Sequence, residues 1–288
     1  MTDLVLVAED EIDIQKLVRM ILERNGFNVI ESHDGIDAEY KIQETLPDIA
    51  LVDVVMPGKG GFEVCKTLKS LNKTQHIPII IFTVLGRDID KKMSKEAGAD
   101  GHFMKPFQPE ELVKTITEAI EQSKKTRFAR SLKLPLAEVL GKKYLFEYDS
   151  RTRYERTVRD FILEGVKNGE KSIIITRDSS VLHSIISKEE KVDHVPLRVP
   201  VVISPLLTKY DEKKVRLVFD SLSDLILSSG FQSTYNLVRD TLPKISGNNY
   251  TTLFLLNPES HEMREVESLR NLFSYQLEYT ENGVLRVK

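Results

Sequence analysis

Short apolar segments alternate with helical patterns through about the first 120 residues, and this alternation constrains the fold more than any other feature of the sequence. Several of these segments are rich in valine and isoleucine, and glycine or proline ends most of the helical patterns between them. Such a series predicts an α/β fold with a parallel sheet covered by helices on both faces. The predicted strands are Leu4–Ala8, Asn28–Glu31, Ile49–Val52, Ile79–Thr83 and Gly101–Met104.

Chemically capable side chains stand at the ends of these predicted strands. Glu9 and Asp10 follow the first strand, and Asp53 follows the third. Thr83 ends the fourth strand, and Lys105 follows the fifth. Because the carboxyl ends of parallel strands share one edge of a sheet, these residues are expected to converge. Two carboxylates ~4 Å apart repel by about 4 kcal/mol at an effective dielectric near 20, so the cluster needs a retained proton or a bound cation.

A hard divalent cation suits this cluster, because Mg²⁺ prefers oxygen ligands and commonly combines carboxylates with waters and a phosphate. A carboxylate beside such an ion can attack a phosphoryl group. Lys105 would then balance the charge of the phosphoryl oxygens, and Thr83 would donate a hydrogen bond. The alternative is that each acid is a helix cap or a solvated loop residue, which explains a single acid better than a set at several strand ends.

The first part of the chain resembles the response-regulator receiver domain of two-component signalling, a CheY-like, flavodoxin-like (βα)5 fold. The resemblance covers roughly residues 3–123 and is carried by VAEDE (7–11), LVDVVMPGKGGFEV (51–64), IIIFT (79–83) and AGADGHFMKPF (97–107). It implies that Asp53 is the phosphoacceptor and that a histidine kinase or phosphotransfer protein is the donor. The Mg²⁺ ligands that it implies are Glu9, Asp10, Asp53 and the backbone carbonyl of Val55.

The resemblance also implies that Thr83 and Lys105 contact the phosphoryl group and that the Lys105–Pro106 bond is cis. His102 takes the place of the family's switch aromatic, and we interpret it as a ring that changes rotamer rather than as a pH sensor. Val84 stands where the family has a small residue, so we expect slower phosphotransfer or hydrolysis. A homodimer through the receiver is a further hypothesis from the family.

Composition places this chain among soluble cytoplasmic proteins of two domains. It has 288 residues, a net charge of −3 and 41% hydrophobic residues, which is enough to bury real cores. Its single cysteine, Cys65, suits a reducing compartment. No segment approaches the ~20 apolar residues of a membrane helix, and the N-terminus lacks the pattern of a signal peptide. The balanced charge does not favour nucleic acid as a partner.

A break between two domains is predicted at residues 124–140, so the domains are expected at 1–123 and 141–288. The linker contains KKTRFARSLK (124–133), with five basic residues and no acid, before Leu134-Pro135-Leu136 and Gly141. The second half again predicts an α/β fold. Its predicted strands are Lys143–Tyr148, Lys171–Thr176, Val215–Phe219, Tyr250–Leu256, Ser274–Tyr279 and Val284–Val287. Its predicted helices are Thr152–Lys167, Ser179–Ser187, Ser221–Ser229, Phe231–Ile245 and His261–Asn271.

The second half resembles the RecA-like fold in the branch around the clock ATPase KaiC. The similar segments are YLFE (144–147), FILEGVKNGEKSIIIT (161–176), VRLVFDSLSDLIL (215–227) and YTTLFLLNPESHE (250–262). They carry the fold rather than a catalytic motif. A phosphate-binding loop needs glycines that turn backbone N–H groups onto phosphate, a lysine, and a serine or threonine for Mg²⁺.

The corresponding turn has other residues in the places of the second glycine, the lysine, and the serine or threonine. It runs from Tyr148 through Asp149, with Arg151, Arg153 and Tyr154 in the region of the second glycine and the lysine, and Glu155 in that of the serine or threonine. Asp220 matches the family's Mg²⁺-binding aspartate, and alone it is expected to cap the next helix.

We therefore predict a domain without ATPase activity that serves as an output or interaction module for an unknown protein partner. The alternative is a nucleotide-binding or ATPase output gated by the receiver. A transcription factor is a third possibility, but the sequence contains no convincing helix-turn-helix. The arginines of the turn leave a weaker hypothesis of an anion site there.

Overall fold

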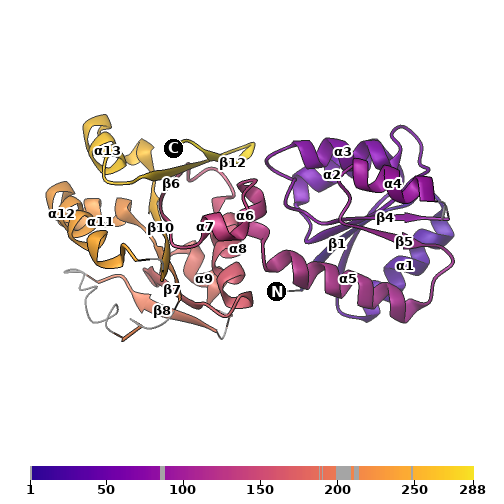
Figure 1. The fold of residues 1–288 in the computed structure, drawn as a ribbon, viewed down its shortest axis with the longest axis horizontal. Coiled ribbons are helices and arrows are strands. Elements are labelled where there is room, and N and C mark those ends of the chain that lie inside the picture. The colour runs from indigo at the N-terminus through magenta and orange to yellow at the C-terminus, as the bar shows by residue number, and fades with distance from the viewer. Residues whose placement is uncertain are drawn as a thin grey trace. The chain divides into compact units, whose positions relative to one another are not determined.

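The computed structural model describes residues 2–84, 88–187, 189, 191–198, 209–210, 214–247 and 249–288. The chain divides into two compact units, Met1–Ser123 and Lys124–Lys288, each built on its own sheet (Figure 1). Within these described ranges, no helix is long and apolar enough to cross a membrane.

The first unit contains a parallel sheet of five strands in the order β2-β1-β3-β4-β5. Each strand begins where the sequence predicted it and ends within one residue of the predicted end. β1 lies between β2 and β3, so the order of the strands reverses beside it. The strands are β1 (Leu4–Ala8), β2 (Asn28–Ser32), β3 (Ile49–Asp53), β4 (Ile79–Thr83) and β5 (Gly101–Met104).

Helices cover both faces of this sheet, and each face has its own apolar core. Leu6 and Ala8 of β1 face a core shared with α2 and α3, whereas Val5 and Val7 face a core shared with α1 and α5. This follows from the alternation of side chains along a strand. The helices are α1 (Ile12–Arg24), α2 (Gly35–Thr45), α3 (Gly61–Ser70), α4 (Asp88–Glu96) and α5 (Pro109–Lys124).

The second unit contains a sheet of seven strands in the order β12-β11-β6-β10-β9-β7-β8. Only β12 runs antiparallel to its neighbour, as the Asn282-Gly283 turn signal suggests. The other pairings are parallel. The strands are β6 (Lys143–Tyr148), β7 (Lys171–Thr176), β8 (Val192–Pro196), β9 (Val215–Phe219), β10 (Tyr250–Leu256), β11 (Tyr275–Thr280) and β12 (Gly283–Arg286).

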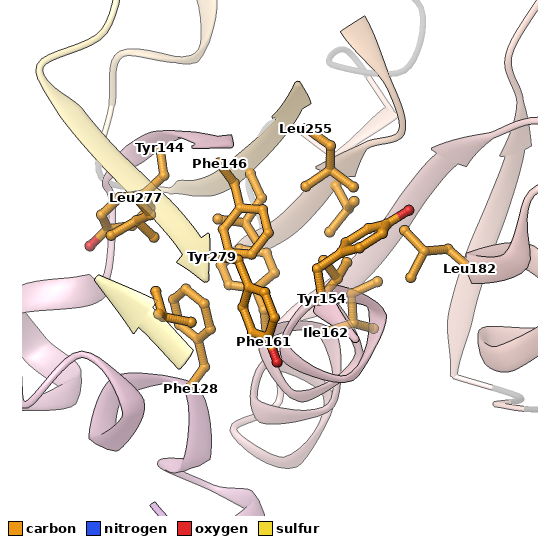
Figure 2. Close-up of a cluster of buried hydrophobic side chains, with 14 of the residues drawn as sticks. Phe128, Tyr144, Phe146, Tyr154, Phe161, Ile162, Leu182, Leu255, Leu277 and Tyr279 are labelled. Carbon is orange, nitrogen blue, oxygen red and sulfur yellow. The ribbon is translucent and has the colours of Figure 1, made fainter. Parts of the chain in front are cut away.

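The second sheet also has one apolar core on each face. Helices α6 to α9 cover the core shown in Figure 2, and α11 to α13 cover the other. Tyr144 and Phe146 of β6 face the first core, and Leu145 faces the second. The helices are α6 (Arg127–Ser131), α7 (Leu136–Val139), α8 (Tyr154–Lys167), α9 (Val181–Ile186), α11 (Leu222–Ser229), α12 (Phe231–Thr241) and α13 (Met263–Arg270), with 3₁₀ turns η1 (Pro243–Ile245) and η2 (Pro258–Ser260).

The segment interpreted as a linker, residues 124–140, belongs to the second unit. Its helix α6 buries Phe128 completely, with the ring edge-on to Phe161 of α8 at 4.9 Å between centroids. The backbone N–H of Ala129 donates to the buried Glu164 carboxylate at 3.0 Å. The Asn168 side chain donates to the carbonyl of Lys125 at 2.7 Å. The sequence prediction missed this packing because the apolar residues of the segment are scattered among cations.

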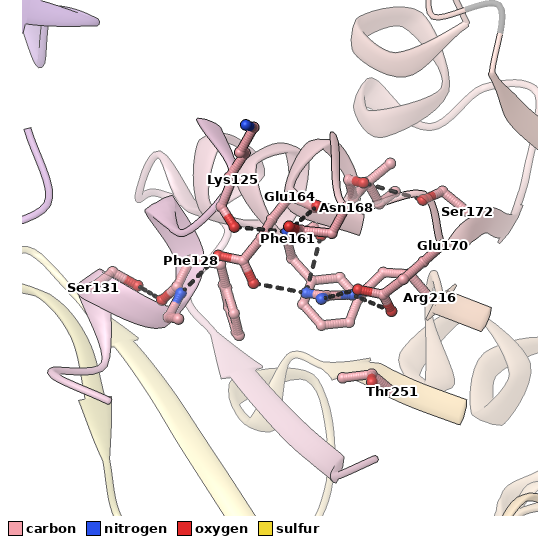
Figure 3. A network of polar contacts seen from close by, with 12 residues as sticks. Lys125, Phe128, Ser131, Phe161, Glu164, Asn168, Glu170, Ser172, Arg216 and Thr251 are labelled. Carbon is pink, nitrogen blue, oxygen red and sulfur yellow. Dashed lines mark hydrogen bonds and ion pairs between the residues drawn. The ribbon is translucent and has the colours of Figure 1, made fainter. Parts of the chain in front are cut away.

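The carboxylate that holds α6 belongs to a buried ionic network, drawn in Figure 3. Arg216 of β9 is fully buried and donates to Glu164 at 2.9 Å and to Glu170 at 2.5 Å. Its guanidinium also lies 4.7 Å from the centre of the Phe161 ring. A Cβ at Gly165 would lie 2.8 Å from the Arg216 side chain, so only glycine fits beside it. Removing one partner from such a buried network typically costs about 3–5 kcal/mol.

Two further elements differ from the sequence prediction. β8 was not predicted, because its sequence VDHVP contains residues that are rare in strands. The helix predicted from Phe231 to Ile245 ends at Thr241, and Pro243 starts the separate 3₁₀ turn η1. Proline lacks the N–H that would continue the helical hydrogen bonds, which explains this break.

The packing of α6 gives a first prediction. We expect Phe128→Ala to destabilise the second unit by about 3–5 kcal/mol, because it removes a fully buried ring and leaves a cavity. Urea unfolding of the full chain, followed residue by residue with hydrogen exchange on β6 and α8, measures this. Met263→Ala is the control, since that side chain is 80% exposed. Equal stability of both variants would contradict the buried role of α6.

Candidate functional site

The first sheet brings its polar strand-end residues together at its carboxyl edge. Glu9 follows β1, and Asp53 ends the neighbouring β3. Thr83 ends β4, in register with the end of β5, just before Lys105. Because β1, β3, β4 and β5 are successive neighbours, side chains far apart in sequence share one edge. This edge lies where the strand order reverses, which is the usual place for a site in such sheets.

Three carboxylates form the centre of this site. Glu9, Asp10 and Asp53 each offer an oxygen, and these oxygens all lie within 4.8 Å of one another. Glu9 is fully buried and Asp53 nearly so, whereas Asp10 is exposed. Converging carboxylate oxygens at this spacing match the donors that Mg²⁺ prefers. The residues therefore fit the cation that the sequence predicted, with Asp10 on the solvent side.

The Lys105 ammonium lies between two of these carboxylates. Its Nζ donates to Glu9 Oε2 at 2.6 Å and to Asp53 Oδ2 at 3.0 Å, and it is only 7% exposed. The same Nζ lies 4.5 Å from the centre of the Phe82 ring, a cation–π contact. The backbone N–H of Lys105 donates to the carbonyl of Thr83, and the bond to Pro106 is cis.

Burial and the lysine act on Glu9 in opposite directions. Burial raises the pKa of the Glu9 carboxyl, and the hydrogen bond and charge of Lys105 lower it; the net change is upward. The negative charge of Asp53 adds to the rise. A raised carboxyl pKa is expected where like charges are held together, and the repulsion between them favours an added cation.

Backbone contacts fix the two buried acids. Gln15, which the sequence interpretation did not single out, donates from its side chain to the carbonyls of Glu9 and Ser32 at 3.0 and 2.7 Å. The N–H of Val54 donates to Asp53 Oδ1 at 2.7 Å. A Cβ at Gly61 would lie 2.1 Å from the Asp53 carbonyl oxygen, so this glycine lets α3 begin directly against β3.

The other predicted residues surround this centre. Thr83 is fully buried. Val55 and Val84 have exposed side chains. The metal contact from the Val55 carbonyl and the slowing effect of Val84 remain predictions. His102 is half-buried on β5, with Nδ1 3.2 Å from Ser94 Oγ of α4. A hydrogen bond between β5 and α4 is consistent with a ring that responds to movement of α4, and its role as a switch also remains a prediction.

In the second unit, the turn after β6 is filled by side chains. Tyr154, the first residue of α8, is buried and stacks on Tyr148 with centroids 3.9 Å apart. Burial raises the pKa of the neighbouring Glu155 carboxyl, and the charge of Asp220 adds to the rise. Arg151 is exposed and pairs with Asp149 at 2.6 Å and with Glu259. Arg153 is also exposed and directly precedes α8.

Asp220 does not cap the next helix, contrary to the sequence expectation. Ser221 is the N-cap of α11, and its side chain accepts from the N–H of Asp224. Asp220 is 4% exposed and accepts hydrogen bonds from the hydroxyls of Thr176 and Ser180, both at 2.6 Å. Burial raises the pKa of its carboxyl, and these hydrogen bonds oppose the rise. The two hydroxyls come from β7 and its following turn, which the local sequence around Asp220 could not reveal.

Comparison with known proteins decides the nature of the first unit. Residues 5–117 match the family model described as the response regulator receiver domain. These residues form a receiver domain. The chain is 39% identical over 112 residues to the phosphate regulon transcriptional regulatory protein PhoB of Escherichia coli, covering 39% of this chain and 49% of PhoB. It is 35% identical over 124 residues to the transcriptional regulatory protein ResD of Bacillus subtilis, covering 43% of this chain and 50% of ResD.

The chain thus spans about half the length of the curated relatives it matches. Among solved structures, it is similar to the chemotaxis protein CheY4 of Vibrio cholerae, with 33% identity and a TM-score of 0.40, covering 41% of this chain and 99% of CheY4. The expectation of a CheY-like receiver domain is confirmed for the first unit. The similarity to PhoB, ResD and CheY4 covers less than half of this chain.

The position of the lysine gives a second prediction. Lys105→Met removes a unit charge that the carboxylates hold directly, so Mg²⁺ should bind more tightly. We expect a gain of at least about fivefold, because a unit charge ~4 Å away is worth on the order of 1–4 kcal/mol. Calorimetric titration of the full chain with MgCl₂ at constant ionic strength measures it. Lys114→Met, at an exposed position of α5, should bind like wild type, and unchanged affinity in Lys105→Met would show that the ammonium does not compete with the cation.

Proposed function

We propose that this protein is a two-component response regulator that accepts a phosphoryl group on Asp53 from a histidine kinase or phosphotransfer protein. One observation carries the proposal: a nearly buried aspartate lies among two more carboxylates and a buried ammonium in a receiver domain. An ordinary solvated acid would not need this environment. The transcriptional regulators PhoB and ResD support a role in regulation, but the match to them covers only about half of each.

The transfer uses the Asp53 carboxylate as a nucleophile. An Asp53 oxygen attacks the phosphorus of a phosphohistidine, so an O–P bond forms while the N–P bond breaks and the imidazole leaves. Glu9, Asp10 and Asp53 would hold Mg²⁺, which when bound offsets the charge of the phosphoryl oxygens. Lys105 already donates to Asp53 and would pair with the phosphoryl group. Thr83 would donate a hydrogen bond from the end of β4.

Output follows from a shift between conformations that already exist. When the phosphoryl group contacts Lys105 and Thr83, it forms new interactions at the ends of β4 and β5. His102 on β5 already contacts α4. Only two residues separate the end of α5 at Lys124 from the start of α6 at Arg127. Because α6 is packed into the second unit, a movement of α5 would act directly on that unit. A homodimer through the receiver is part of the same hypothesis.

The second unit is proposed as a RecA-like output or interaction domain without ATPase activity. A strand, a turn and a long helix, β6 to α8, keep the frame of a phosphate-binding loop, and this supports the assignment. The stacked Tyr148 and Tyr154 occupy the turn, and a Glu155 carboxylate there would repel phosphate. The alternative, a nucleotide-binding output gated by the receiver, rests on Asp220, which its two hydroxyl partners already engage.

Phosphorylation gives a third prediction. Acetyl phosphate with Mg²⁺ should add one phosphoryl group to the wild-type chain, seen by intact mass spectrometry, and hydroxylamine should remove it, because acyl phosphates react with that nucleophile. Asp53→Asn should show no labile phosphate. Asp13→Asn, at an exposed position of α1, is the matched control and should label like wild type. Labelling that survives in Asp53→Asn would refute the phosphoacceptor assignment.

The filled turn gives a fourth prediction. Calorimetric titration of MgATP into the full chain should show no binding at micromolar concentrations and no release of phosphate over hours. The cause is steric and electrostatic, since Tyr154 is buried in the turn and Glu155 adds negative charge. Micromolar affinity that is lost in Asp220→Asn would instead support the gated-nucleotide alternative.

A further inference from the structure

A cavity of about 560 Å³ lies at the amino edge of the second sheet, the edge away from the turn after β6. Its walls come from the starts of β6, β10 and β11, the end of β12 and the residues before β7 and β9. Its remaining wall comes from residues 134–140, the segment that includes α7. The volume falls in the range of small-molecule sites, roughly 300–1,000 Å³. The phosphotransfer chemistry proposed above uses none of these residues.

Tyr144 gives the cavity a polar group, its hydroxyl. Its side chain is 2% exposed and lines the cavity, at the margin of the cluster in Figure 2. In the described part of the chain, no hydrogen bond is made by its hydroxyl. Because Tyr144 lines the cavity and its hydroxyl is not among the buried unpartnered atoms of the described residues, this hydroxyl is available to a bound molecule. Burial raises the pKa of Tyr144 to about 12, so the group is a donor at neutral pH.

The charges around the cavity are mainly positive. Lys142, Lys214 and Arg286 line it, and the Arg286 charge acts on the Tyr144 hydroxyl. Lys142 donates to the Tyr275 hydroxyl at 2.7 Å and lies 4.6 Å from the centre of that ring. Neither Lys214 nor Arg286 forms an ion pair with a described carboxylate.

Two carboxylates also line the cavity, but they do not cancel this charge. Glu170 pairs with the buried Arg216 at 2.5 Å, and it shares that guanidinium with Glu164. Glu138 is exposed on α7. With Arg216 and both of its glutamates included, four cations face three carboxylates, so the net charge around the cavity is positive and attracts an anion.

Apolar side chains also line the cavity. Leu134 and Leu140 are half-buried and line the cavity, with Leu134 packed against the core that contains Phe128. The Tyr275 ring adds an aromatic surface to the lining. A ligand that matches both the apolar and the cationic lining residues needs an apolar body and an anionic group.

We propose that this cavity binds a small aryl carboxylate or aryl phosphate. Its anionic group pairs with Lys214 and Arg286 and accepts a hydrogen bond from the Tyr144 hydroxyl. The aromatic body lies between Tyr275 and the leucines of residues 134–140. Occupancy stabilises the packing of that segment, which follows α6 directly. The site does not depend on phosphorylation of Asp53, so it can be tested in the unphosphorylated chain.

Calorimetric titration of the full chain with three probes tests the proposal. They are 1-naphthyl phosphate, 1-naphthoate and the neutral 1-naphthol, which share one aromatic body. We expect at least one of the two anions to bind saturably, with a Kd between about 1 µM and 1 mM, and naphthol to bind at least about fivefold more weakly. The two anions distinguish a phosphate from a carboxylate ligand.

Variants locate the binding. Arg286→Gln is at an exposed position and should weaken the preferred anion at least about fivefold, and Tyr144→Phe at least about threefold, as expected for a charged and a neutral hydrogen bond. Circular dichroism confirms that each variant is folded. Arg264→Gln, an exposed arginine on α13 outside the cavity, is the matched control and should bind like wild type.

Three outcomes overturn the proposal. One is the absence of saturable binding by both anions. Another is equal binding of 1-naphthol, which would show an apolar cavity without anion selectivity. The third is a loss of affinity in Arg264→Gln as large as in Arg286→Gln, or none in either cavity variant, which would place the bound anion elsewhere.

Discussion

The receiver domain depends on the ammonium of Lys105, which lies between the carboxylates of Glu9 and Asp53. Two acids this close and this buried repel, and the lysine is the protein's own compensation for that repulsion. A metal ion would compete with the ammonium for the same carboxylate oxygens. An incoming phosphoryl group would offer the ammonium new oxygens to pair with. Parallel strand order makes this possible, because it brings together residues 96 positions apart in the chain.

In the second unit, buried charges of opposite sign are paired around Arg216. Its two glutamates both pair with it, and one of them also accepts the N–H of Ala129, so the ionic network and the helix α6 hold each other in place. A buried ionic network favours one arrangement mainly because breaking it leaves an unpaired charge. The segment that follows the receiver in the sequence is therefore held within the second unit by this network. The same unit has a filled turn at the carboxyl edge of its sheet and an open cavity at the amino edge.

The local pattern was sufficient to predict most strands and the acidic centre. Glu9, Asp10, Asp53, Thr83 and Lys105 could be found because each stands next to an apolar strand, and strand ends of a parallel sheet must share an edge. The pattern was insufficient for α6, where Phe128 is a single aromatic among cations and its partner Phe161 lies 33 residues away. It was also insufficient for Asp220, because the hydroxyls of Thr176 and Ser180 come from a different strand and its turn.

The sequence by itself determined which elements form and which chemical groups stand at their ends, because periodicity and turn residues act over a few positions. The tertiary structure alone decided which of those groups meet: the lysine between two acids, the tyrosine pair in the turn after β6, and the cations around the amino-edge cavity. These meetings depend on strand order and on the burial of whole faces. The free energies of strand pairing and of burial depend on residues distant in the chain, so a local sequence pattern does not predict these contacts.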